Sequence, residues 1–262
     1  MSVETHVHRA RERARSERDA FDAKLDAYGR FVERVADVTA ETTGAPAADV
    51  ATTGGAGRYV GRSTPDCCRS VRTAFAETVR PHSVADVDES EPLLASIRAE
   101  LGDPVAVALA PATEASFSAE VKRAVLSEAT ARKTQTAVVR RALEREVTGL
   151  ETAATLVDEA TAWIAETDET PLCDVGFDGL RERHETLAAF SDRCDEAVHE
   201  RQSRLRSKTG HDVDSAVDHR DLVAFLYGDF PVDYPVLSTV ARLDETCREC
   251  RRTVRDHLVR RA

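Results

Sequence analysis

The chain has 262 residues, a formal net charge of −11 from 36 basic and 47 acidic side chains, and only 5% aromatic residues. A chain of this length can bury a sizeable core, and with so few aromatic side chains that core must consist mainly of Leu, Val and Ala. Such a core favours helices packed on helices. No apolar run approaches the roughly 20 residues that span a bilayer, so we expect no membrane partner and a cytoplasmic location.

The basic residues are almost all arginine. Only Lys24, Lys122, Lys133 and Lys208 are lysines, and the single methionine is the first residue. An acidic, lysine-poor chain of this kind is typical of salt-loving archaea, in which surface carboxylates keep proteins soluble in concentrated salt. Six cysteines are too few for the disulfide framework of a secreted protein, and we expect them to be reduced.

Residues 3–42 are predicted to form the first long helix, because apolar residues recur at steps of four and three. His6 and His8 lie two apart on this helix, so they do not face one another, and we expect both to be exposed. The following stretch, Gly44–Ser63, is rich in glycine but lacks the dinucleotide-binding spacing, and Ala56 and Arg62 stand where a P-loop needs glycine and lysine. We interpret it as a flexible connection.

Short helices are predicted over residues 64–111 and 218–228. Thr64, followed by a proline, has the pattern of a helix cap with proline in the first turn. The loop Pro81–Glu91 between two of these helices is acidic, and we interpret it as a solvated connection. Asp218 is expected to cap the helix of the second region.

The longest predicted helix covers residues 116–168, a segment without proline and with a single glycine, Gly149. A helix of about 50 residues is about 75 Å long, and its second half has the apolar spacing of a coiled coil. Residues 176–208 and 235–261 carry similar repeats. Because the link after residue 168 is short, the helices on either side of it should be antiparallel neighbours.

These segments together predict an all-α protein with one elongated antiparallel four-helix bundle of coiled-coil type. We expect a single elongated helical domain over residues 1–262, in which the short helices cap one end of the bundle. The four long helices of this prediction cover residues 3–42, 116–168, 176–208 and 235–261.

Four cysteines offer an alternative interpretation as a zinc or redox site. Cys67 and Cys68 are adjacent, and Cys247 and Cys250 form a C-x-x-C pair, so four thiolates could bind one Zn²⁺. Both members of the second pair, however, fall on the apolar seam of their helix, where cysteine acts as a small buried hydrophobic residue. We favour core packing and expect no metal and no cofactor.

Several polar residues lie on the helix seams. We interpret them as a polar layer in the bundle in preference to a catalytic site. His184 and His257 lie on seams, and Ser191 and Cys194 follow the first of them. A nucleophile also needs a base, an orienting group and an oxyanion donor in one accessible place. We find no catalytic motif and predict that the protein is not an enzyme.

Arginine-rich helix ends suggest a second alternative, a nucleic-acid-associated regulator. Residues 242–262 hold seven arginines and four acids, and further basic runs occur at Arg140–Arg141 and Arg201–Lys208. The acidic balance of the chain argues against it, as does the steep loss of phosphate contacts at high salt. The leading hypothesis is a structural or protein-interaction protein with a partner site or a homodimer seam on its bundle surface.

Three stretches, combined with the long helical N-terminal segment and the arginine-rich last helix, carry a resemblance over nearly the full length. With them the chain resembles a haloarchaeal family of helical proteins of unknown function. The resemblance implies a helical fold and a haloarchaeal source, and it implies no chemistry. The stretches are Arg69–Val79 with Pro81-His82, Glu91-Pro-Leu with the Ala-Glu-Leu-Gly that follows, and Leu226–Leu237.

Overall fold

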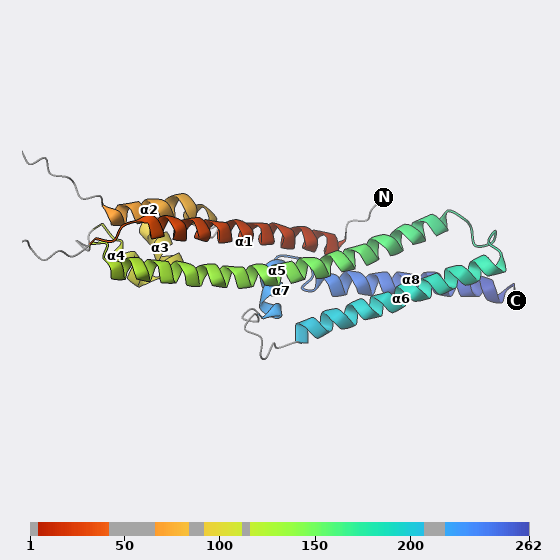
Figure 1. The fold of residues 1–262 in the computed structure, drawn as a ribbon. Coiled ribbons are helices and arrows are strands. Elements are labelled where there is room, and N and C mark those ends of the chain that lie inside the picture. Colours follow the sequence, from red (N-terminus) through yellow and green to blue (C-terminus); the bar gives the residue numbers. More distant parts are fainter. Residues whose placement is uncertain (1–4, 42–65, 84–91, 112–115, 207–217, 262) are drawn as a thin grey trace, which may run out of the picture. The chain divides into compact units, whose positions relative to one another are not determined.

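The computed structural model describes residues 5–41, 66–83, 92–111, 116–206 and 218–261. Within these ranges the regular elements are eight α-helices and one short 3-10 helix, with no strand, so the all-α prediction is confirmed (Figure 1). The predicted connection Gly44–Ser63 lies outside the described residues, as does Pro81–Glu91 after Ser83.

The long helices lie inside the four ranges predicted for them. Helix α5 (Ala119–Asp168) has the 50 residues expected of the longest helix. The other three long helices begin and end within five residues of the predicted limits. These are α1 (His6–Asp37), α6 (Phe177–Arg206) and α8 (Pro235–Val259).

The chain divides into two compact units. The first unit consists of Met1–Asp19 and Val138–Ala262, and the second unit is Ala20–Ala137. Each unit is described by itself below. A single elongated domain with a four-helix bundle therefore stays a prediction.

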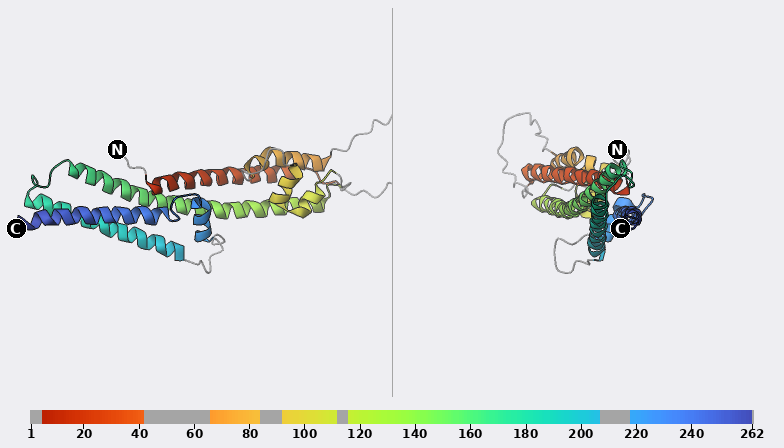
Figure 2. Two further views of the ribbon diagram at one scale, coloured as in Figure 1. Left: turned by 180° about the vertical axis from the view of Figure 1, so that it is seen from behind. Right: turned by 90° about the vertical axis from the view of Figure 1, so that its right-hand side faces the viewer.

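The first unit is built on α6 and α8, which lie side by side along much of their length (Figures 1 and 2). Their facing residues include Leu187, Cys194 and Cys247, all at most 2% exposed. The short helix α7 (His219–Tyr227) begins at the predicted cap, since the Asp218 side chain accepts a hydrogen bond from the Arg220 backbone N–H at 2.9 Å.

The second unit has its own core, in which α2 (Cys67–Thr78) packs against the second half of α1. Phe31 and Phe75 are fully buried and meet edge to face with ring centroids 5.7 Å apart. Helix α2 begins later than predicted, because Asp66, and not Thr64, caps it by accepting from the Arg69 backbone N–H. A carboxylate accepts this bond at least as well as a threonine hydroxyl does.

Buried polar groups tie α1 to α3 (Leu93–Leu101) in this second unit. The Glu100 carboxylate accepts hydrogen bonds from Tyr28 Oη at 2.5 Å and from Lys24 Nζ at 2.7 Å. Burial alone would raise the pKa of Glu100, but the lysine and tyrosine donors outweigh it and lower that pKa below its usual range. The carboxylate is therefore ionised at neutral pH and fixes the position of α3.

Gly102 joins α3 to α4 (Asp103–Ala108) in a conformation that requires glycine. Its φ of 86° and ψ of 163° lie in a region that residues with a Cβ rarely occupy. Replacing Gly102 by Ala should lower the free energy of unfolding by about 1–3 kcal/mol, measured by urea titration. Gly176→Ala is the control, because an added Cβ there meets no atom within 4 Å, and no loss of stability is expected.

Candidate functional site

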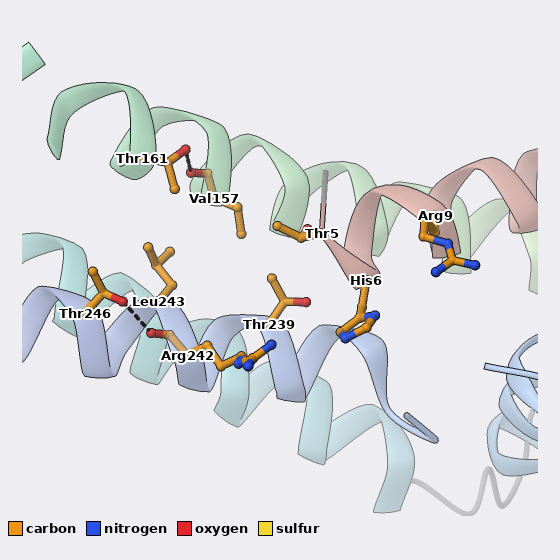
Figure 3. Close-up of a pocket in the computed structure, with 9 residues that line it drawn as sticks. All are labelled: Thr5, His6, Arg9, Val157, Thr161, Thr239, Arg242, Leu243 and Thr246. Carbon is orange, nitrogen blue, oxygen red and sulfur yellow. Dashed lines mark hydrogen bonds between the residues drawn. The ribbon is translucent and has the colours of Figure 1, made fainter. Parts of the chain in front are cut away.

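A groove of about 850 Å³ opens on the first unit where α1 begins against α5 and α8 (Figure 3). We call it the α1–α5–α8 groove. Its volume falls in the range of about 300–1,000 Å³ typical of ligand sites. The residues that line it are Thr5, His6, Arg9, Val157, Thr161, Thr239, Arg242, Leu243 and Thr246.

The lining residues of α8 and α5 have the spacing of a helix face made for packing. On α8 they are Thr239, Arg242, Leu243 and Thr246, separated by three, one and three residues, which places them on one stripe. Val157 and Thr161 on α5 are four residues apart and form a similar stripe. A helix opposite these stripes would be needed to complete a bundle seam, and α1 begins only at His6.

The floor of the groove holds a buried hydroxyl without a partner. Thr239 is 6% exposed, and its Oγ1 makes no hydrogen bond within the part of the chain that the structure describes. The other helical threonines of the groove differ, because Thr161 Oγ1 donates to the Val157 carbonyl at 2.7 Å and Thr246 Oγ1 donates to the Arg242 carbonyl at 3.0 Å (Figure 3). A hydroxyl buried in this way favours a ligand that accepts a hydrogen bond from it.

The polar rim of the groove carries basic side chains and no carboxylate among the described lining residues. His6 and Arg9 come from α1 and Arg242 from α8. Arg9 lies over the Phe230 ring at 5.7 Å, a cation–π contact that leaves its donors available. In a chain with a net charge of −11, this groove is a local basic site.

The expectation that both N-terminal histidines are exposed is wrong for His8. His8 is 8% exposed, with its Nδ1 2.8 Å from Thr5 Oγ1 and its Nε2 3.2 Å from Asp158 Oδ1. These contacts hold the first turn of α1 against α5 and engage the Asp158 carboxylate. His6 is partly buried and belongs to the rim.

The cysteines of the zinc and redox alternative are divided between the units. Cys67 and Cys68 lie in the second unit, and Cys247 and Cys250 lie in the first. Each is a free thiol, and burial raises the pKa of Cys247 to about 11, so its thiolate is scarce at neutral pH. Across the described ranges, no group of three or more His, Cys, Asp or Glu side chains is arranged to hold a metal ion.

The seam residues considered for catalysis do not form a nucleophile–base pair among the contacts that the structure gives. His184 Nε2 accepts a hydrogen bond from Arg251 Nε at 3.2 Å. Burial and then the nearby Arg251 charge lower the pKa of His184, so the ring is neutral near pH 7. Ser191 is buried, and burial raises the pKa of Cys194 to about 12. The absence of an enzyme activity stays a prediction.

Several arginines of the nucleic-acid alternative have structural contacts. Arg201 is 4% exposed and forms a bidentate pair with Glu146 at 2.7 and 2.8 Å, so the basic run that it begins is not entirely a solvated face. Arg248 pairs with Asp244 at 2.8 Å, and Arg261 donates to backbone carbonyls of the link between α5 and α6.

Around Glu146 a buried polar cluster attaches α7 to α5. Tyr227 Oη donates to Glu146 at 2.7 Å, and His219 Nε2 lies 3.6 Å from the same carboxylate. Burial opposes ionisation of Glu146, but the Arg201 and Tyr227 donors prevail and lower its pKa. Burial lowers the pKa of His219 as well, against the attraction of Glu146, and the Arg201 charge adds to this effect.

The depressed pKa of His219 predicts a loss of stability in mild acid. Below its unfolded pKa of about 6.5, the unfolded chain binds a proton that the folded chain resists, so stability is highest above that pH and falls as the pH drops through it. We expect His219→Gln to lose less unfolding free energy between pH 7.5 and 5.5 than the wild type, measured in urea. Replacement of the exposed His199 should leave the wild-type slope unchanged.

The groove has no direct signal in the sequence, since none of its nine lining residues belongs to a chemical motif. The row of threonines and an arginine on the stripe from 239 to 246 was the available hint. Thr239, Arg242 and Thr246 each precede an apolar seam residue of α8 by one position, so they lie beside the seam and mark a face that does not enter a dry core.

No helix within the described ranges is long and apolar enough to cross a membrane.

Comparisons with known proteins identify a family. No curated protein and no solved structure matched the chain. The model of the domain of unknown function DUF7260 matches residues 5–251. That match covers most of the 262 residues, α1 through most of α8, and the chain therefore belongs to the DUF7260 family.

Proposed function

We propose that this protein is a non-enzymatic protein-interaction protein of a salt-loving archaeon, and that its α1–α5–α8 groove receives a helix of a partner protein. One observation carries the proposal. The stripes of α5 and α8 keep bundle spacing beyond the first turn of α1, but within the described residues they face an open groove. A helix laid into such a groove completes the seam with ordinary side-chain packing.

The composition of the stripes supports a reversible contact more than a permanent core. Val157 and Leu243, which are 2% and 6% exposed, form the apolar floor of the groove, and the threonines and Arg242 surround them with polar groups. An apolar centre with a polar rim is the usual anatomy of a protein interface. Partners that exchange must be soluble when apart, which this mixture permits.

The experiment places a photoreactive benzoylphenylalanine at Thr161, inside the groove, or at the neighbouring exposed Ala162 as control, in the native cells. The proposal expects a covalent product with one other protein from position 161 and not from 162. A product joining two copies of this chain, a crosslink within one chain, or no product at position 161 would each overturn it.

The captured protein must then bind the purified chain. Thr246→Trp fills the groove from an exposed position and should weaken binding at least tenfold. Thr155→Trp is matched to it, because Thr155 is also exposed and makes the same bond to a carbonyl four residues earlier, but it does not line the groove. Equal binding by both variants would place the contact elsewhere and contradict the proposal.

A further inference from the structure

We infer that the groove selects an acidic amphipathic helix, one whose apolar stripe is flanked by carboxylates. This inference rests on the proposed function and names the chemical class of the partner. It is carried by the arrangement of charge around the groove and by the partnerless hydroxyl in its floor.

The charge arrangement comes from both sides of the groove. His6 and Arg9 lie on α1 and Arg242 lies on α8, so cationic or hydrogen-bond-donating groups line two different walls of the groove (Figure 3). Among the described residues no ion pair is formed by His6, Arg9 or Arg242, and the nearby carboxylate of Asp158 is engaged by His8. The basic rim is thus available to carboxylates on either flank of an incoming helix.

The apolar centre sets the register of that helix. Val157 and Leu243 project from facing helices into the groove (Figure 3), and a helix meets such a pair with residues three or four apart. Glutamates beside that stripe then reach the rim. The Oγ1 of Thr239 donates to one of these carboxylates, which satisfies the hydroxyl that the unbound groove leaves without a partner.

The acidic balance of the rest of the molecule also favours this groove as the binding site of an acidic helix. Salt screens partly buried charge pairs much less than exposed ones, so at close contact an acidic helix is disfavoured over most of a surface with a net charge of −11 and favoured at this rim. A basic helix would be attracted to the surface in general and repelled at the rim, so charge selects both the partner and the place.

The test uses two synthetic peptides of about 18 residues, long enough to form a helix. They share one Leu/Ala stripe and differ only in its flanks, Glu in one and Lys in the other. Fluorescence anisotropy measures the binding of each to the full chain at moderate salt. The inference expects the Glu peptide to bind at least tenfold more tightly than the Lys peptide.

Two charge reversals on α8 locate the binding. Arg242→Glu should abolish the preference for the Glu peptide, whereas Arg252→Glu makes the same change of charge at an exposed position outside the groove and should preserve it. Thr239→Val should weaken the Glu peptide at least threefold while making the unbound protein more resistant to urea, because it removes a buried hydroxyl without a partner.

Four results would overturn the inference. Equal binding of both peptides, tighter binding of the Lys peptide, or a preference that survives Arg242→Glu each removes the acidic class. If neither peptide binds, the inference also fails. The proposed function fails separately, when the photoreactive group at Thr161 captures no other protein, so the two failures are distinguished.

Discussion

Replacing Glu146 by Leu is expected to lower the free energy of unfolding by about 3–5 kcal/mol. The change leaves Arg201, 4% exposed, without the carboxylate that accepts both of its bonds, and it removes the acceptor of Tyr227 Oη. A buried charge without its partner retains its full cost of desolvation. Urea titration followed by circular dichroism measures the loss.

Two further variants separate the buried charge from a general effect of mutation. The double variant Glu146→Leu with Arg201→Leu should recover the part of the loss that comes from the unpaired Arg201 charge, because apolar residues can replace a buried ion pair at little cost, and should keep the part that comes from Tyr227 Oη. Glu159→Gln breaks the pair with Arg193, in which both side chains are about half exposed, and should cost at most about 1 kcal/mol. A loss of similar size in Glu146→Leu and Glu159→Gln would contradict the burial argument.

Replacing Phe75 by Ala is the second change with a large expected effect, about 3–5 kcal/mol of unfolding free energy. The Phe75 side chain is fully buried in the second unit and contacts Phe31 edge to face. Its removal loses apolar burial and leaves a cavity that a close-packed core fills only in part. The loss is measured by urea titration at the same salt concentration.

Phe225→Ala is the control for this change, because it deletes the same side chain from a site where it is 53% exposed. Its effect should stay within about 0.5 kcal/mol. Hydrogen exchange shows which of the two units each variant destabilises. Phe75→Ala should reduce protection in the second unit first, and Glu146→Leu in the first unit first. Uniform loss of protection in both variants would mean that the two units open as one.

The helices were predictable because their signal is local. Steps of three and four residues mark one helix face, and proline or glycine marks its ends, so α5 was placed within three residues at either end. The cap of α2 was predicted at the wrong residue, Thr64 in place of Asp66. Thr64 and Asp66 are both good caps two residues apart, and the choice between them depends on contacts that a sequence pattern does not contain.

The candidate site was not predictable because it depends on contacts between distant residues. His8 was expected to be exposed because of its spacing from His6. It is buried, and its Nε2 contacts Asp158, 150 residues away. Arg201 appeared to belong to a basic run, but Glu146 lies 55 residues earlier. In the same way, the groove exists because α1 begins opposite the last third of α5 and the first half of α8, and no single segment of the sequence shows that alignment.

The division of the chain has a consequence for its synthesis. The second unit is one continuous segment, Ala20–Ala137, inserted between the two pieces of the first. A ribosome that adds about 5–20 residues per second therefore completes the second unit early. Residues 5–19 must wait roughly 6–24 s before residue 138 of their own unit is even made. Only Val7, Ala10 and Ala14 of this short segment are apolar, so it exposes little apolar surface during the wait.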